Sequence, residues 1–229
     1  MPISLLSEDL SFPDPRRATD EGLVAMGGDL RLERLLEAYK RGIFPWYSED
    51  QPILWFSPNP RMVLYPTRFR RPESLKRLIK SNKFEVRIDS NFATVIRSCA
   101  AIPRPGQSGT WITEDMIDAY IDLHHRGYGH SFEAYLNGNL VGGLYGLSLG
   151  RAFFGESMFH TAPNASKVAF DQLVAFCLQH NFLFIDAQTP SQHLQSLGAE
   201  EIERDQYLAE LQVALNCESI VRRWSVDEQ

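Results

Sequence analysis

Two carboxylates and one amide stand where the sequence predicts strands buried in the core. Glu156 lies in the apolar run 152–159, and Asp186 and Gln188 end the apolar run 182–188. Carboxylates are rarely buried without a partner, because their charge is costly to remove from water. Residues of this kind are either fixed in ion pairs or kept to bind substrate and handle protons.

Period-two alternation predicts how these side chains are oriented, since successive side chains of a strand point to opposite faces. In the first run, Glu156 is expected to share its face with Phe154 and Met158. In the second run, Asp186 and Gln188 are expected to project together. A strand end that turns polar as it leaves the core is the simpler explanation for either of the latter residues alone.

Glu156 also has a competing explanation in which it serves only the fold. An ion pair with Arg151 or with Lys167, both close in sequence, would satisfy its charge without any chemistry. The sequence leaves both explanations open.

Antiparallel strands followed by one crossover must position these groups. The sequence predicts a hairpin with a type I′ turn at Asn137-Gly138, then the strand of Glu156. A long helix over 164–180 then crosses to the strand that ends at Gln188. This order predicts an α+β fold whose main part has the mixed sheet of an acyl-CoA N-acyltransferase (GNAT-like).

Composition divides the chain into two predicted domains. Residues 1–62 are rich in proline and aromatic side chains and form a small N-terminal α/β domain, with one clear helix near 32–39. Residues 63–229 form the GNAT-like domain. The chain has no signal-peptide pattern and no apolar run of roughly 20 residues, so we expect a cytoplasmic monomer away from the membrane.

Cysteine and histidine spacings predict neither disulfides nor a metal site. The three cysteines are far apart in the sequence and each falls in a helical pattern, which favours free thiols: Cys99, Cys177 and Cys217.

The charge of the chain is distributed unevenly. A net charge of −6 argues against a nucleic-acid partner, but residues 61–87 contain nine Lys or Arg and only two Glu. Electrostatic fields decay within about 10 Å at ordinary salt, so a partner responds to local charge. A solvated helix face is the alternative explanation. The residues predicted to bind phosphates within this basic segment are Arg68, Arg70, Arg71, Lys76, Arg77, Lys80 and Lys83.

The connection at 157–167 bears on the acyl donor. N-acetyltransferases hold the pyrophosphate of their cofactor on backbone N–H groups of a Gly-rich loop at a helix N-terminus. This connection has no Gly-x-Gly run and contains Pro163. We therefore expect a donor other than acetyl-CoA, with an acetyl-CoA-dependent N-acetyltransferase as the rival enzyme.

The chain resembles the leucyl/phenylalanyl-tRNA–protein transferases of bacteria. The resemblance is collinear from about Phe12 to Tyr207. Its main motifs are Gly27-Gly28-Asp29-Leu30, Gly42-Ile43-Phe44-Pro45-Trp46, Pro52-Ile53-Leu54-Trp55, Gly109-Thr110-Trp111-Ile112-Thr113, Gly155-Glu156-Ser157-Met158-Phe159, Asn164-Ala165-Ser166-Lys167 and Ser196-Leu197-Gly198-Ala199.

The resemblance implies an aminoacyltransferase. Such enzymes move Leu, Phe and, less well, Met from aminoacyl-tRNA to the α-amino group of proteins that begin with Arg or Lys, which marks them for N-degron (N-end rule) degradation. The implied partners are aminoacyl-tRNA and these proteins, and no cofactor or metal is implied. A non-catalytic module that binds RNA ends or N-degrons is the rival of another class.

The resemblance also implies roles for the site residues. Asp186 would hold or deprotonate the incoming amine, directly or through Gln188, so Asp186→Ala is expected to abolish transfer with little loss of stability. Glu156 would meet the cationic end of the acceptor or organise the site. Trp46, Trp111 and Phe153 would lie near the terminal adenosine of the tRNA, and the aminoacyl pocket would be walled by Tyr39, Tyr120, Leu144 and Met158, of which the two tyrosines could equally be core residues.

Overall fold

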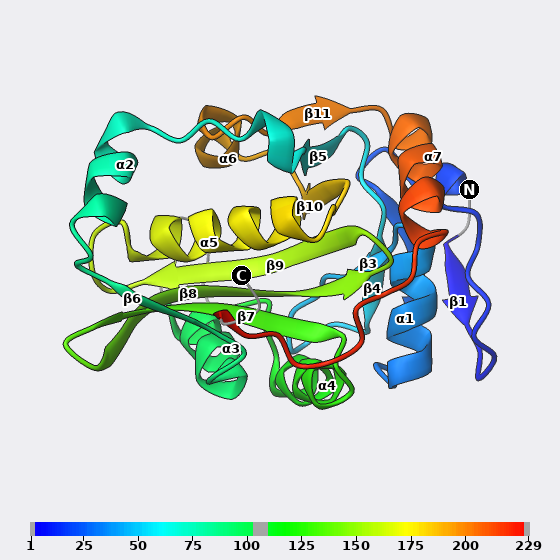
Figure 1. Ribbon diagram of the computed structural model, residues 1–229. Coiled ribbons are helices and arrows are strands. Elements are labelled where there is room, and N and C mark those ends of the chain that lie inside the picture. Colours follow the sequence, from blue (N-terminus) through cyan, green and yellow to red (C-terminus); the bar gives the residue numbers. More distant parts are fainter. Residues whose placement is uncertain (1–2, 103–109, 227–229) are drawn as a thin grey trace.

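The computed structural model describes residues 3–102 and 110–226, which form an α+β fold with two sheets (Figure 1). The smaller sheet has the strand order β1-β2-β4-β3, and the larger sheet has the order β11-β5-β10-β9-β8-β7-β6. The strands of the smaller sheet are β1 (Ser4–Leu6), β2 (Leu23–Gly27), β3 (Phe44–Pro45) and β4 (Leu54–Phe56).

The larger sheet confirms the predicted fold class, and it contains the predicted hairpin, the strand of Glu156 and the strand that ends at Gln188. Its strands are β5 (Arg61–Leu64), β6 (Glu85–Ile88), β7 (Gly129–Leu136), β8 (Asn139–Leu149), β9 (Ala152–His160), β10 (Phe184–Gln188) and β11 (Glu200–Ile202). Among the described strands of this sheet, β9 and β10 are the one parallel pair, and the crossover helix α5 (Ala165–Gln179) joins them. The hairpin turn at Asn137 and Gly138 has φ of 51° and 78°, as a type I′ turn requires.

Helices cover both faces of the larger sheet. In Figure 1, α5 lies on one face, while α3 (Phe92–Ala101) and α4 (Glu114–His125) lie on the other. Each face therefore has its own apolar cluster, and Phe153 and Phe154 point to different clusters, as neighbours on one strand should. The remaining helices are α1 (Leu32–Lys40), α2 (Glu73–Lys80), α6 (Gln192–Ser196), α7 (Arg204–Leu215) and the two single 3₁₀ turns Pro15–Arg17 and Pro66–Arg68.

The smaller sheet packs against one end of the larger one through α1 and α7. Trp55 and Tyr39 from the N-terminal part belong to the same buried cluster as Phe154. Gly42 follows α1 at φ 72°, and a Cβ there would lie 2.7 Å from the ring of Tyr207. Only glycine fits both this turn and this close approach.

The domain division between residues 62 and 63 stays a proposal. β5 begins at Arg61 and belongs to the larger sheet, whereas the last strand of the smaller sheet ends at Phe56. The two sheets nevertheless share one apolar cluster, which favours joint folding.

Across the described ranges, no helix has the length and apolar character needed to cross a membrane.

Candidate active site

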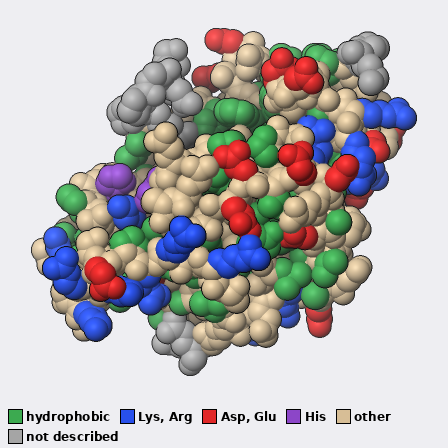
Figure 2. Space-filling model, turned by 90° about the horizontal axis from the view of Figure 1, so that it is seen from above, with side chains coloured by type: hydrophobic (Ala, Val, Ile, Leu, Met, Phe, Trp, Pro, Cys, Tyr) green, Lys and Arg blue, Asp and Glu red, His purple; other side chains and the backbone are tan. Residues whose placement is uncertain are grey.

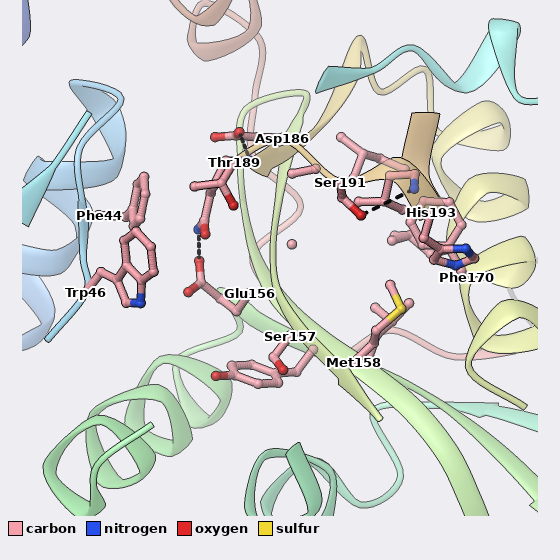
Figure 3. Close-up of a pocket in the computed structure, with 18 of the residues that line it drawn as sticks. Phe44, Trp46, Glu156, Ser157, Met158, Phe170, Asp186, Thr189, Ser191 and His193 are labelled. Carbon is pink, nitrogen blue, oxygen red and sulfur yellow. Dashed lines mark hydrogen bonds between the residues drawn. The ribbon is translucent and has the colours of Figure 1, made fainter. Parts of the chain in front are cut away.

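A cavity lies where the parallel strands β9 and β10 separate. Ala152–Phe154 pairs with Phe184–Asp186, and the two strands have no pairing beyond those residues. A cavity of about 440 Å³ occupies this separation, between β9, β10, α5 and the segment that contains β3 (Figure 3). Its lining includes Phe44, Pro45, Trp46, Trp111, Leu144, Gly155, Glu156, Ser157, Met158, Phe170, Leu173, Ile185, Asp186, Ala187, Gln188, Thr189, Ser191, His193 and Leu194.

A β-bulge at Glu156 aims its side chain into the cavity. Ser157 pairs with Tyr145 and Gly155 with Gly146, so Glu156 is the extra residue between consecutive pairs. The bulge also reverses the alternation: Phe154 packs in the α3 and α4 cluster, and Met158 packs against the α5 cluster. The prediction that Phe154, Glu156 and Met158 share one face was therefore wrong.

Glu156 is buried among neutral hydrogen-bond donors. Its Oε1 accepts hydrogen bonds from the hydroxyl of Tyr39 at 2.6 Å and from Nε2 of Gln188 at 2.7 Å, and its Oε2 accepts one from Tyr120 at 3.3 Å. The two tyrosine hydroxyls also hydrogen-bond to each other. Burial is the largest cause that raises the pKa of Glu156, to about 7, with a smaller upward contribution from the charge of Asp186 and a lowering effect of the hydrogen bonds from Tyr39, Tyr120 and Gln188.

Neither competing ion pair of Glu156 forms. Within the described part of the chain, Glu156 has no Lys or Arg at salt-bridge distance, and Arg151 instead donates to the carbonyl of Glu218 at 2.8 Å. An ionisable carboxyl with a pKa near neutrality and no cationic partner therefore faces the cavity.

Asp186 has a different environment from the predicted one, because a buried arginine holds it. Arg61 donates from Nε to Oδ1 at 2.9 Å and from Nη2 to Oδ2 at 2.6 Å, and both side chains are completely buried. Tyr207 donates to Oδ2 at 2.8 Å, and the backbone N–H of Gln188 donates to Oδ1 at 2.8 Å. A carboxylate offers about four acceptor positions, so these four donors fill them.

Of the two routes predicted for Asp186, direct or through Gln188, the geometry favours the second, because four donors already occupy its oxygens and one of them is the N–H of Gln188. Gln188 does line the cavity, and its side-chain amide donates a hydrogen bond to Glu156. The structure thus brings the three predicted groups together as a chain of hydrogen bonds, in which Gln188 links Asp186 to Glu156.

The structure places five of the predicted substrate-binding residues in the cavity wall: Glu156, Trp46, Trp111, Leu144 and Met158. Trp46 is 39% exposed, at the mouth. Tyr39 and Tyr120 are fully buried behind Glu156, so they contact the site through its carboxyl rather than by walling the pocket. In Figure 3, Trp46 and Glu156 lie toward one side of the cavity and Met158 and His193 toward the other.

The placement predicted for Phe153 is corrected. Its ring is fully buried between Phe132 and Trp224, in the cluster under α5, and it does not line the cavity. It precedes the bulge in β9, on a part of the strand that is still paired with β10.

The predicted tRNA-binding residues are all exposed, along α2 and its flanking segments. Figure 2 shows a gathering of Lys and Arg side chains at the left, the side on which Figure 1 labels α2. Three of them have acidic partners: Arg68 with Glu200, Arg71 with Asp171, and Lys76 with Glu73. Those without an ion pair among the described residues are Arg70, Arg77, Lys80 and Lys83.

Several residues of the site were not predicted from the sequence. Arg61 was counted within the basic segment, but it is buried and holds Asp186. His193 and Ser191 lie in the wall near α6, and no motif pointed to them.

No group of His, Cys, Asp or Glu suited to a metal ion occurs in residues 3–102 and 110–226. Cys99, Cys177 and Cys217 form no disulfide.

Comparison with known proteins identifies the class. The model of the leucyl/phenylalanyl-tRNA protein transferase family matches residues 63–212, and the model of its N-terminal domain matches residues 28–59. Proteins named leucyl/phenylalanyl-tRNA–protein transferase are similar along nearly the whole chain. The one from Solidesulfovibrio magneticus is 51% identical over 98% of this chain and 91% of its own, and the one from Desulfatibacillum aliphaticivorans is 51% identical over 100% and 98%.

Solved structures give only a distant likeness of fold. A GCN5-related N-acetyltransferase-like protein from Streptococcus suis is 17% identical, with a TM-score of 0.37 over 74% of this chain and 63% of that one. L-PGS from Bacillus licheniformis is 11% identical, with a TM-score of 0.43 over 71% and 54%. Similarity at this level concerns the fold and does not extend to the residues of the site.

The protein is an acyl-transferring enzyme, specifically an aminoacyltransferase. It belongs to the leucyl/phenylalanyl-tRNA protein transferase family.

Proposed function

We propose that this enzyme transfers Leu and Phe, and Met less well, from aminoacyl-tRNA to the N-terminal α-amino group of proteins that begin with Arg or Lys. The observation that carries the proposal is Glu156: a carboxyl with a pKa of about 7, no cationic partner among the described residues, and a place in a cavity with aromatic and apolar walls. Family membership supports the donor and the kind of acceptor.

The reaction needs alignment and a modest proton acceptor. The amine nitrogen bonds to the ester carbon, the bond from that carbon to the ribose oxygen breaks, and the proton that the amine loses is passed on to the departing ribose oxygen, which leaves as a hydroxyl. An α-amino group has a pKa near 8, so it is partly neutral at physiological pH. Glu156, with a pKa of about 7, is matched to accept the proton, and Gln188 orients the amine beside it.

The cavity walls suit the donor. Trp46 and Trp111 present indole rings on which the terminal adenosine can stack. Leu144, Met158 and Leu173 form an apolar wall for the side chain of Leu or Phe. Shape disfavours the β-branched side chains of Ile and Val, but because one methylene is worth about 1–3 kcal/mol, their exclusion is incomplete.

The cellular role follows from the acceptor. A transferred Leu or Phe becomes the new first residue, and we propose that it directs the product to N-degron proteolysis. Aminoacyl-tRNA is a cytoplasmic substrate, so we place the enzyme in the cytoplasm, and we propose that it acts as a monomer because one chain contains the whole cavity.

The first experiment measures transfer of radiolabelled Leu, Phe and Met from charged tRNA to peptides that begin with Arg, Lys or Ala. We expect transfer to the Arg and Lys peptides, with Leu and Phe ahead of Met, and none to the Ala peptide. Equal transfer to the Ala peptide would overturn the acceptor assignment. Binding of acetyl-CoA in calorimetry, with acetylation of the same peptides, would favour the N-acetyltransferase instead.

The exposed basic residues of α2 are proposed to receive tRNA phosphates. Phosphate contacts release counterions, so each one adds to the salt dependence of binding. We expect Arg77→Glu/Lys80→Glu to weaken tRNA binding and to flatten the slope of affinity against salt concentration. Both side chains are exposed and free of ion pairs among the described residues, so the fold should be unaffected.

The matched control is Arg17→Glu/Lys40→Glu, which makes the same change in net charge. Both residues are exposed, and α1, which ends at Lys40, lies at the opposite end of the molecule from α2 in Figure 1. This control should bind tRNA nearly as the unaltered enzyme does. Equal loss in the two double variants would show that net charge, rather than the α2 surface, determines affinity.

A further inference from the structure

We infer that Arg61 is a positioning residue for transfer: by holding Asp186 it fixes Gln188 against Glu156, and by holding Gly42 it fixes the aromatic wall opposite. The inference rests on the proposed function, because it concerns the same cavity.

Arg61 is the central residue of a fully buried network. Besides its two hydrogen bonds to Asp186, it donates from Nη1 to the carbonyl of Gly42 at 3.1 Å and from Nη2 to the hydroxyl of Tyr207 at 3.2 Å. Its guanidinium lies 4.9 Å from the ring centroid of Phe44 and 4.4 Å from that of Tyr207. The planar fork of arginine matches this set of acceptors, and the single ammonium of lysine does not.

The network holds a strained backbone. Gln188 has φ 63°, in the left-handed region that residues other than glycine rarely adopt, and it follows a bulge where β10 skips one residue against β5. Its N–H donates to Asp186 at 2.8 Å, which anchors the bulge. Strained residues of this kind persist only where their surroundings hold them.

That conformation is what brings the Gln188 amide to Glu156. With Asp186 held by two bonds from Arg61, Oδ1 stays where it accepts the Gln188 N–H, and Nε2 of Gln188 stays 2.7 Å from Glu156. Removing the arginine frees the Asp186 carboxylate, and the amide that orients the amine loses its fixed place.

The second contact of Arg61 reaches the other wall of the cavity. Gly42 precedes Phe44 and Trp46, which line the cavity, and the Phe44 ring lies under the guanidinium. One side chain therefore sets the distance between the β10 wall and the β3 wall. Reactions that depend on alignment are sensitive to such spacing: a misplacement of about 1 Å can cost about 100-fold in rate.

The decisive variant is Arg61→Met/Asp186→Leu, which replaces the buried ion pair by apolar side chains. Buried pairs replaced in this way often leave stability unchanged or improved. We expect a melting temperature close to that of the unaltered enzyme and a fall in kcat of about 100-fold. If the pair served the fold alone, the double variant would keep both the melting temperature and the kcat of the unaltered enzyme, and the inference would be overturned.

A second variant covers the case in which the double variant does not fold. Arg61→Lys keeps the charge but loses the fork, so we expect a folded protein whose kcat per folded molecule falls while the KM for aminoacyl-tRNA changes little. An unchanged kcat in this variant would contradict the inference.

Arg34→Met supplies the matched control. Arg34 is also completely buried and pairs with an acid, Asp29 at 3.2 Å, but it does not line the cavity. It should lose stability while its folded fraction keeps normal kcat. The unaltered enzyme, run alongside, separates the two hypotheses: absence of transfer there would refute the proposed function, whereas transfer there and in the double variant would refute only the role of Arg61.

Discussion

Glu156→Gln is expected to lower kcat/KM by about 100-fold or more while making the folded protein more stable at pH 8. The activity falls because an amide cannot accept the proton of the amine, and general base catalysis contributes roughly 10²–10⁴-fold. Gln keeps the size of the side chain and can still accept hydrogen bonds from Tyr39 and Gln188. Steady-state kinetics on an Arg-initiated peptide would measure the loss.

The stability gain follows from the raised pKa. The folded enzyme retains the proton of Glu156 up to about pH 7, whereas the unfolded chain releases it near its ordinary pKa of 4.5. Because the folded state binds more protons in this window, stability falls as pH rises from about 4.5 to about 7. The Gln variant lacks this fall in stability, which amounts to about 3 kcal/mol of unfolding free energy for a pKa shift of this size.

Two measurements check this prediction together. Urea unfolding at pH 5 and pH 8 should show that the Gln variant has a higher free energy of unfolding than the unaltered enzyme only at pH 8. The pH profile of kcat/KM should rise through about pH 7 in the unaltered enzyme, as Glu156 ionises, and lose that rise in the variant. A variant with the unaltered pH profile would show that Glu156 does not accept the proton.

Asp186→Ala is expected to abolish transfer and to destabilise the protein by about 3–5 kcal/mol, the cost of leaving a buried charge unpaired. Arg61 would remain completely buried with no acid at hand, and the Gln188 N–H would lose its acceptor. This replaces the expectation, based on the sequence, that the substitution would leave stability nearly unchanged. Denaturant unfolding and single-turnover transfer would measure the two effects.

Asp205→Ala is the control for Asp186→Ala. Asp205 pairs with Arg16 at 2.6 Å, but both side chains are more than half exposed. Exposed pairs contribute about 0–1 kcal/mol, so this variant should unfold and react almost normally. Equal stability of the two variants would mean that the buried pair contributes no more than a surface pair.

The order of elements could be predicted from local patterns. A helix of the length of α5 and a turn such as Asn137-Gly138 leave signals in a few neighbouring residues, because period and turn chemistry are local. The cluster of Glu156, Asp186 and Gln188 could be predicted in the same way, since polar groups inside apolar strands stand out. Trp46 and Trp111 were placed by resemblance to a family, and the cavity wall contains both.

The directions and partners of these side chains could not be predicted. A bulge adds one residue to a strand without changing its composition, so alternation placed Met158 on the wrong face. The partner of Asp186 is Arg61, which is 125 residues away in the sequence, and nothing local distinguishes this arginine from the exposed ones that follow it. Contacts of this kind depend on the closure of the whole sheet.

The separation of β9 from β10 has a consequence for how proteins with different sequences can serve as acceptors. Past Phe154, the edge of β9 that faces β10 has no strand partner among the described residues, so an extended polypeptide could pair with it as an added strand. Main-chain hydrogen bonds of that type recognise the chain itself, whatever its side chains. An enzyme that acts on proteins of different sequences can gain affinity from such contacts without narrowing its choice.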